Sequence, residues 1–159
     1  MYNDIGDTMK ILIKTFQELT NEELYEIIKL RVDVFILEQE CFYDELDDRD
    51  QNAIHIFIKE DSIEGYCRVF PPGDHFKETQ IGRVVTKTRG KGYGKAVMGA
   101  AINYLSSHYP NDSIRIEAQT YAEAFYNKLG FYKVSDPFLE DGILHIEMLR
   151  GKGRCKNES

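Results

Sequence analysis

A short glycine-rich stretch near the middle of the chain has the residue types of an anion-binding loop. Residues 88–97 read TRGKGYGKAV, in which three glycines alternate with other residues and basic side chains lie on both sides. Glycines allow tight turns and leave backbone N–H groups unobstructed by a Cβ atom. The helix expected to follow adds the positive end of its dipole, and Arg89, Lys91 and Lys95 add charge. This combination suits a pyrophosphate, although an ordinary exposed turn with solvated lysines would have the same composition.

Two well-known nucleotide-binding loops do not fit this spacing. A Walker A loop has four residues between its first glycine and Gly-Lys-Ser/Thr, but Gly90 is followed too soon by Gly94, and Ala96 replaces the hydroxyl that would hold magnesium. The dinucleotide fingerprint GxGxxG fits Gly92 and Gly94 but has Val97 as its third glycine, with no acidic ribose partner about 20 residues later. The loop therefore predicts an anion site of another kind.

Length and charge limit the classes of function. The chain has 159 residues, enough for one domain with a real core, and carries a net charge of −7. An acidic protein is a poor candidate for nucleic-acid binding through a basic surface, so the basic loop is a local feature. No apolar run approaches the roughly 20 residues that span a bilayer, and the N-terminus lacks the apolar segment of a signal peptide. We therefore expect neither a nucleic acid nor a membrane as partner.

The cysteines and the acidic stretch at residues 44–52 do not have the pattern of metal sites. The three cysteines are far apart and form no CxxC pair: Cys41, Cys67 and Cys155. This spacing disfavours a disulfide framework and a zinc site, and it favours the reducing cytoplasm. Part of the acidic stretch matches the start of an EF-hand, but Ala53 replaces the required glycine and Lys59 the bidentate glutamate. We expect no metal; the stretch is either a solvated charged run or an attractor for a cationic amine.

Alternating strands and helices must position the glycine loop. We expect one domain over residues 9–150, between an N-terminal extension at 1–8 and a disordered tail at 151–159. The segment Thr20-Asn-Glu-Glu23 has the form of a capping box and predicts a helix that ends near Leu37. Further helices are expected at residues 92–107 and 121–129. Strands are expected at residues 10–16, 54–59, 63–70, 80–86, 113–119, 131–134 and 143–149, the second and third forming a hairpin.

Several segments resemble one family. Arg89-x-x-Gly92-x-Gly94, between a Val-Val strand and an amphipathic helix, resembles motif A of the GNAT superfamily, the Gcn5-related N-acetyltransferases. Downstream, Ala124-Phe-Tyr126-Asn-Lys-Leu-Gly130-Phe131 resembles the end of motif B of that family. Three more segments are similar to the ElaA-like branch: Leu30-Arg31-x3-Phe35-x2-Glu38-Gln39, Ile81-Gly82-Arg83-Val84-Val85 and Asp141-Gly-Ile143-x-His145-Ile146-x-Met148. The resemblance extends over nearly the whole expected domain.

The resemblance implies a fold and an activity. The fold would be α/β (α+β), with a mixed, mostly antiparallel central sheet of about seven strands, splayed at the coenzyme A site, and helices on both faces. The activity would be that of an acyltransferase, an acetyl-CoA-dependent N-acetyltransferase that moves an acetyl group to a primary amine by direct attack in a ternary complex. The acceptor would be a small-molecule or peptide amine, and a homodimer is an expectation because dimers are frequent in the family. A non-catalytic module that binds or senses coenzyme A is the alternative, and a nucleotide-binding protein is disfavoured by the loop spacing.

The resemblance also assigns the cofactor-binding residues. Pantetheine would pair with the backbone around residues 83–85, and a backbone N–H of Val84 or Val85 would polarise the thioester carbonyl. The amides and basic side chains of the glycine loop would hold the pyrophosphate. The cofactor-binding set is Val84, Val85, Arg89, Gly90, Lys91, Gly92, Tyr93, Gly94 and Lys95.

Catalysis requires a proton donor for the leaving thiolate and, where water does not suffice, a base for the amine. Tyr126 is the candidate acid, because a phenol is ordinarily protonated at neutral pH and its position in the motif B resemblance favours it over a packed aromatic. The candidate bases are Glu38, His55, Glu117 and His145. Glu38 and His145 are favoured, as base or for substrate orientation, since the ElaA-like resemblance is concentrated around them. Acceptor binding is assigned to a wider set, whose members could equally be structural ion-pair or hydrogen-bond partners: Arg31, His55, Arg68, Arg83 and Glu117.

Overall fold

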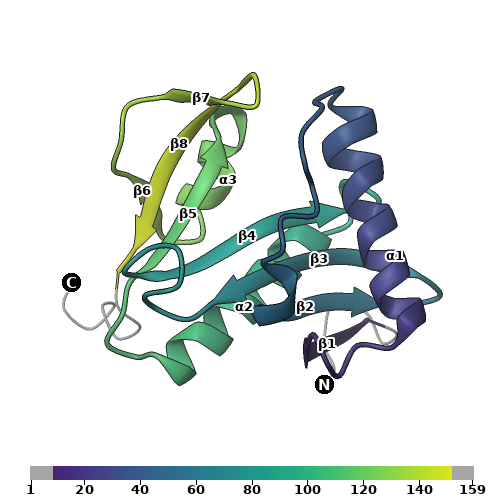
Figure 1. The fold of residues 1–159 in the computed structure, drawn as a ribbon. Helices are drawn as coiled ribbons and strands as arrows, with labels where there is room; N and C mark the ends of the chain where they lie inside the picture. Colours follow the sequence, from purple (N-terminus) through teal and green to yellow (C-terminus); the bar gives the residue numbers. More distant parts are fainter. Residues whose placement is uncertain (1–8, 152–159) are drawn as a thin grey trace. The chain divides into compact units, whose positions relative to one another are not determined.

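The computed structural model describes residues 9–151, and these residues fall into two compact units (Figure 1). Unit 1 comprises residues 9–69 and 83–101, and unit 2 comprises residues 70–82 and 102–151. The extension expected at 1–8 lies outside the described residues. The tail expected at 151–159, which contains Cys155, also lies outside them except for Gly151.

In unit 1, a helix packs on antiparallel strands. Strand β1 (Lys10–Thr15) pairs with β2 (Ile54–Lys59), which forms a hairpin with β3 (Ile63–Phe70). Helix α1 (Asn21–Arg31) begins with the predicted capping box: the Thr20 hydroxyl accepts from Glu23 N at 3.0 Å and the Glu23 carboxylate accepts from Thr20 N at 2.9 Å. The capping box is therefore confirmed.

The chain leaves α1 in an unexpected conformation. The predicted helix runs to Leu37, but α-helical geometry ends at Arg31 and a π-helix, η1 (Val32–Glu38), continues from it. Its wider turns are visible in the bonds from Gln39 N to Val34 O and from Cys41 N to Ile36 O, both 3.2 Å. A loop with a short 3₁₀ turn, η2 (Asp50–Asn52), then leads to β2. The polar loop predicted before β2 is confirmed.

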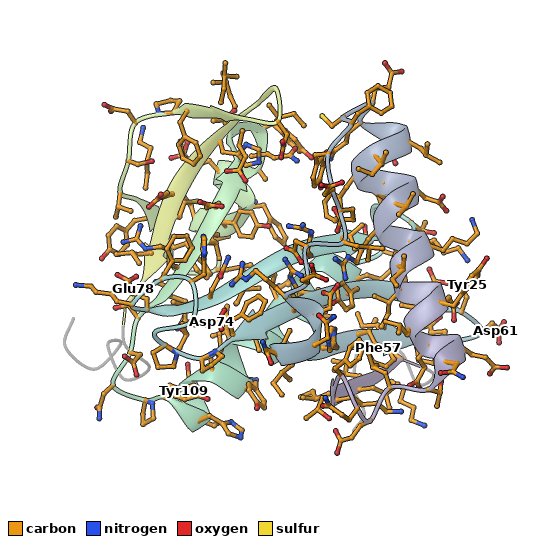
Figure 2. The ribbon with its side chains drawn as sticks, in the orientation of Figure 1. Tyr25, Phe57, Asp61, Asp74, Glu78 and Tyr109 are labelled. Carbon is orange, nitrogen blue, oxygen red and sulfur yellow. The ribbon has the colours of Figure 1, made fainter. Side chains whose placement is uncertain are left out.

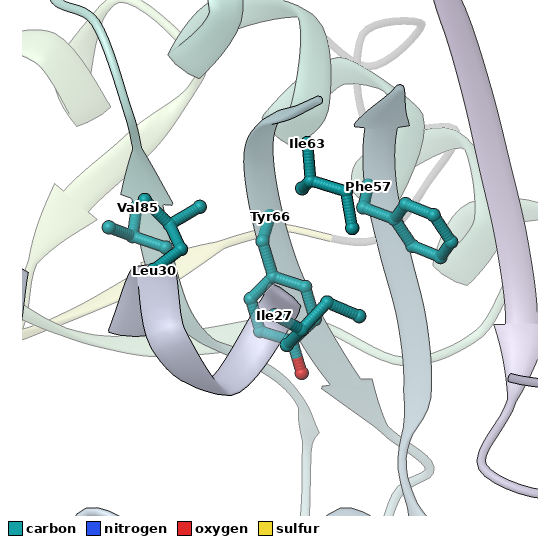
Figure 3. Close-up of a cluster of buried hydrophobic side chains, with 6 residues drawn as sticks. All are labelled: Ile27, Leu30, Phe57, Ile63, Tyr66 and Val85. Atoms are coloured by element: carbon teal, nitrogen blue, oxygen red, sulfur yellow. The ribbon is translucent and has the colours of Figure 1, made fainter. Parts of the chain in front are cut away.

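The core of unit 1 joins α1 to the sheet (Figure 3). Ile27 and Leu30 on the inner face of α1 pack against four buried strand residues: Phe57, Ile63, Tyr66 and Val85. On the other side of the helix, Tyr25 is 74% exposed, whereas Phe57 is fully buried (Figure 2). This packing holds the end of α1 and strand β4 (Thr79–Thr86), which contributes Val85, in one core.

Unit 2 is built around the pair β5 (Ile114–Gln119) and β8 (Ile143–Arg150), which run antiparallel with Gln119 opposite His145. Strands β6 (Phe131–Lys133) and β7 (Phe138–Glu140) both pair with β8. A 3₁₀ turn, η3 (Thr120–Ala122), and helix α3 (Glu123–Asn127) connect β5 to β6. Helix α2 (Tyr93–His108) contributes its first half to unit 1 and its second half to unit 2.

The strand order is β1-β2-β3-β4-β5-β8-β6, with β7 paired to β8 off this path. The expected mixed, mostly antiparallel sheet is confirmed, but the described residues form eight strands rather than seven, because the short β7 shows no alternation in sequence. In the described part of the chain, the parallel ladder between β4 and β5 consists of Thr79–Ile114 and Gln80–Arg115, although both strands continue beyond it. None of the helices within residues 9–151 is long and apolar enough to cross a membrane.

Candidate functional site

The glycine loop between β4 and α2 adopts a backbone that needs glycine. Gly90 and Gly92 have φ angles of 81° and 80°. A Cβ atom built at either position would meet no atom within 4 Å, so glycine is needed for the backbone conformation and not for lack of space. The loop therefore presents bare backbone next to an open region.

The loop opens directly into the positive end of α2. Ala96 N donates to Gly92 O at 3.0 Å, which makes Gly92 the residue that precedes the helix. The first N–H groups of a helix have no acceptor within the helix, and they carry the positive end of its dipole. The side chains of Arg89, Lys91 and Lys95 are exposed beside them. Bare glycine backbone, a helix N-terminus and three exposed basic side chains thus lie together in unit 1.

Tyr93 fastens the start of α2. Its side chain is buried, its hydroxyl donates to Glu60 Oε1 at 3.2 Å, and its Cβ lies 3.5 Å from where a Cβ at Gly65 would stand. Position 65 therefore lies in van der Waals range of Tyr93. Because the ring is buried against the β2–β3 hairpin, only the backbone of Tyr93 is left to make the predicted contact with a phosphate.

The structure brings two predicted site residues together at the loop. Arg89 Nη2 lies 2.8 Å from Glu38 Oε2, at the end of the π-helix. Both side chains are largely exposed, at 65% and 49%, so the pair contributes at most about 1 kcal/mol. A stronger anion could replace the Glu38 carboxylate at Arg89.

Tyr126 lies on α3 in unit 2, within an aromatic group. Its ring meets Phe125 and Phe131 edge-on, with centroids 5.0 Å and 6.0 Å away. Glycine suits the position before Phe131, because Gly130 has φ of 95°, and a Cβ there would also make a tight contact of 3.0 Å with Arg150 Nε. The predicted motif around Tyr126 is therefore a packed turn that holds the phenol ring.

His145 and Glu117 also belong to unit 2, where β8 pairs with β5. His145 Nδ1 lies 2.8 Å from Ile143 O; a carbonyl can only accept, so Nδ1 carries the proton and Nε2 is the basic nitrogen. Phe138 stacks on the imidazole at 6.1 Å between centroids. Glu117 faces Glu147 across the β5–β8 ladder.

The arginines expected to bind an acceptor have partners inside unit 1. Six charged side chains from α1, the loop after η1, β3 and β4 form one ion-pair network: Arg31, Glu45, Asp47, Asp50, Arg68 and Arg83. Their formal charges cancel. Arg31 is 0% exposed and Arg68 is 2% exposed, so charges this deep in the protein need such partners.

Asp50 is the centre of one half of this network. Its Oδ1 accepts from Arg31 Nη1 at 2.9 Å and from Arg68 Nη1 at 2.8 Å. Asp47 completes the contact to Arg68, with Oδ2 2.6 Å from Nη2. Burial by itself raises the pKa of Asp50, but the two guanidinium groups outweigh it and the net pKa is lowered.

His55 lies beside this network as a buried, neutral residue. Its Nε2 is 2.9 Å from Asp50 O and therefore donates, which leaves Nδ1 to accept from Tyr66 Oη at 2.7 Å. Burial lowers the pKa of His55, and Arg31 and Arg68 lower it further. A protonated His55 would lie beside the positive charges of Arg31 and Arg68, while Asp47 and Asp50 are already paired with arginines.

These contacts change the interpretation of the acidic stretch at residues 44–52. It was expected to be either a solvated run or an attractor for a cationic amine, but Glu45 and Asp50 are buried and, with Asp47, pair with arginines of this chain. The structural role of these acids was not predicted from the sequence. A signal was present in β3, where Arg68 stands between apolar neighbours in the run Tyr-Cys-Arg-Val-Phe and needs a buried partner.

We expect the network to make the stability of the protein depend on pH. The folded pKa of His55 is below its unfolded value, so the unfolded chain binds the proton more readily and stability falls as pH drops below about 6.5. Asp47 and Asp50 also have lowered pKa values, so their contribution is present above about 3.9 and is lost as pH falls through the folded values. Urea unfolding at a series of pH values measures both effects.

The His55→Gln variant separates the two ranges. Glutamine cannot titrate, so the loss of stability between about pH 7 and pH 5 should be smaller than in the wild type, while the loss at lower pH stays. The matched control is His75→Gln, because His75 is exposed. An equal pH slope in His55→Gln and wild type would contradict the assignment to His55.

Arg83 has the most unusual backbone of the network. It lies within β4 with φ of 55°, a left-handed conformation that costs a non-glycine residue roughly 1–2 kcal/mol. Such a residue persists only where its surroundings hold it. Arg83 Nε donates to Glu45 Oε2 at 2.5 Å and Nη2 donates to Glu45 O at 3.2 Å. We expect these two hydrogen bonds to hold the backbone of Arg83 in its left-handed conformation.

Comparison with known proteins gives one consistent family. Residues 15–150 match the family model described as Acetyltransferase (GNAT) domain. A UPF0039 protein of Mycobacterium tuberculosis is 40% identical over 148 residues, which cover 88% of this chain and 92% of that protein. Protein ElaA of Escherichia coli is 33% identical over 138 residues, covering 84% of this chain and 90% of ElaA.

Solved structures agree with these relatives. An acyl-CoA N-acyltransferase from Pseudomonas aeruginosa superposes with a TM-score of 0.84 at 32% identity, over 89% of this chain and 99% of that one. The crystal structure of Escherichia coli ElaA superposes with a TM-score of 0.83 at 31% identity, with the same coverage. The fold expected from the sequence is therefore confirmed, with its central sheet of eight strands.

Proposed function

This chain belongs to the GNAT acetyltransferases, in the group that includes ElaA and the UPF0039 proteins, and from this premise we propose that it transfers an acetyl group from acetyl-CoA to a primary amine. The observation that carries the proposal is the glycine loop. Gly90 and Gly92 hold left-handed backbone at the start of α2, among three exposed basic side chains. Bare amides, a helix N-terminus and positive charge are what a pyrophosphate requires.

The residues of unit 1 fit acetyl-CoA as the acetyl donor. The open space around Gly90 and Gly92 admits phosphate oxygens close to the backbone, and Arg89, Lys91 and Lys95 neutralise their charge. A pyrophosphate would displace Glu38 from Arg89, since an exposed ion pair is weak. A backbone N–H of Val84 or Val85 would polarise the thioester carbonyl and stabilise the oxyanion that forms there.

Two side chains of unit 2 supply the proton chemistry in this proposal. The amine nitrogen forms a bond to the acetyl carbon, the carbon–sulfur bond breaks, and Tyr126 donates the proton that the leaving sulfur takes up. His145 is favoured over Glu38 as base, because its Nε2 is the acceptor nitrogen. The acceptor remains a small-molecule or peptide amine, and the chemistry needs no metal.

We also propose that the protein works in the cytoplasm. Cys67 is a free thiol, and it is buried. A free thiol of this kind suits a reducing compartment.

Direct binding and turnover measurements test the proposal. We expect calorimetry to show one acetyl-CoA per chain, and a thiol-release assay with a panel of amines to show turnover that depends on both substrates. Acetyl-CoA binding without thiol release on small amines, polyamines and lysine peptides alike would instead identify a module that binds or senses coenzyme A. ATP competing with acetyl-CoA at similar concentrations would support a nucleotide-binding protein.

A further inference from the structure

Arg83 changes the backbone conformation of β4 at a point that matters for the proposed chemistry. Its left-handed φ of 55° comes three residues after the Gln80–Arg115 pair that ends the ladder to β5, and directly before Val84 and Val85. A left-handed residue in a strand is typical of a β-bulge, which redirects the backbone and ends regular pairing. The direction of the next two N–H groups therefore depends on the conformation of Arg83.

Glu45 holds Arg83 from a fixed position. Its Oε2 accepts from Arg83 Nε at 2.5 Å and from Arg31 Nε at 2.8 Å. Its backbone carbonyl accepts from Arg83 Nη2 at 3.2 Å and from Arg31 Nη2 at 3.3 Å. Because Arg31 is the fully buried last residue of α1, Glu45 connects β4 to the helix through two parallel sets of bonds.

Neighbouring groups occupy the remaining polar atoms of this contact. Tyr43 Oη donates to Glu45 Oε1 at 2.6 Å, and the Arg83 guanidinium lies 5.8 Å from the centre of the Tyr43 ring. Arg83 Nη2 also approaches Asp47 Oδ2 at 3.4 Å. Both carboxylate oxygens of Glu45 and two nitrogens of Arg83 are thus used within the chain, which argues against Arg83 as a ligand for a substrate carboxylate.

We propose that Glu45 is a positioning residue: through Arg83 it sets the left-handed backbone of β4, and with it the direction of the Val84 and Val85 N–H groups. This inference rests on the proposed function, because those N–H groups matter to the reaction only if they face a thioester. It gives Arg83 a role in the backbone, where the sequence suggested a role in acceptor binding.

The test compares two substitutions that both remove the guanidinium. Glycine adopts a φ near 55° freely, whereas alanine does not. We expect Arg83→Ala to lower kcat about ten-fold more than Arg83→Gly does, with little difference between them in the KM for the amine, because an oxyanion donor acts on the transition state. Equal losses in both variants, or a loss confined to the amine KM, would show that the guanidinium itself contacts the substrate and would overturn the inference.

Glu45→Gln tests whether Glu45 acts through Arg83. In the wild-type background it should lower kcat, because the charge that holds Arg83 is gone. In the Arg83→Gly background the same change should have little further effect on kcat, since Glu45 then has no arginine in β4 to hold. If Glu45→Gln lowers kcat as much in the Arg83→Gly background as in the wild type, Glu45 acts through a group other than Arg83.

A measurement without turnover keeps this inference separate from the proposed function. The amide resonances of Val84 and Val85 in nitrogen-15 spectra should move in Arg83→Ala and Glu45→Gln but stay close to wild type in Arg83→Gly. If wild type acetylates no amine yet these shifts follow the expected order, the proposed reaction fails and the hold of Glu45 on the backbone stands. If the shifts do not follow it in a folded, active protein, the inference fails and the proposed reaction stands.

Discussion

Replacement of Gly92 by aspartate should abolish measurable binding of acetyl-CoA. Gly92 has φ of 80°, and a Cβ there meets no atom within 4 Å, so the new side chain fits but strains the backbone. Its carboxylate would lie at the N-terminus of α2, where the pyrophosphate is proposed to bind, and would repel it. We expect the Kd from calorimetry to rise at least about 100-fold, equivalent to roughly 2.7 kcal/mol.

Two further variants separate the causes. Gly73→Asp is the matched control, because Gly73 is exposed, has φ of 87° and also has no atom within 4 Å of an added Cβ, but lies outside the glycine loop. It should bind acetyl-CoA like the wild type. Gly92→Ala adds the backbone strain without the charge and should fall between the two. Unchanged affinity in Gly92→Asp would remove the loop from the donor site.

The Tyr126→Phe variant should lose most of its turnover while keeping its affinity for acetyl-CoA. Phenylalanine preserves the ring that meets Phe125 and Phe131 edge-on, so the turn around α3 stays packed. The loss is confined to the hydroxyl proton, which is proposed to reach the leaving sulfur. General acid catalysis typically contributes 100-fold or more, so we expect kcat to fall about 100-fold with the KM for acetyl-CoA within about three-fold of wild type.

The control for this variant is Tyr132→Phe, an exposed tyrosine in the neighbouring strand β6. It removes the same atom from the same unit and should leave kcat near wild type. Steady-state kinetics on an amine identified in the panel would measure both. A kcat for Tyr126→Phe that matches the control would rule Tyr126 out as the acid.

Local patterns in the sequence predicted the elements that local forces determine. The β2–β3 hairpin was predicted with the bounds it has in the structure, because apolar runs on either side of a short polar turn are a short-range signal. The start of α1 followed from the reciprocal bonds of Thr20 and Glu23. The glycine loop was recognised because positive φ angles at Gly90 and Gly92 demand that residue type.

Features that depend on distant residues were not predictable in this way. The π-helix at Val32–Glu38 has no distinct composition, since the same residues would be acceptable in an α-helix. The burial of Glu45 depends on Arg83, which is 38 positions away in the chain. A carboxylate in an acidic loop is normally solvated, and the burial of Glu45 becomes favourable only when Arg31 of α1 and Arg83 of β4 pair with it. The left-handed Arg83 follows from the same long-range contacts.

The order in which unit 1 folds should follow from the arginines of its ion-pair network. Arg31, Arg68 and Arg83 belong to α1, β3 and β4, and each can leave water only when a carboxylate from residues 45–50 arrives. Until then these elements can associate through Ile27, Leu30 and their apolar neighbours, but the guanidinium groups of the three arginines stay hydrated. The last step of folding should therefore be closure of a polar loop over a preformed core. Its rate would slow with salt and with acid, whereas the earlier collapse would respond to neither.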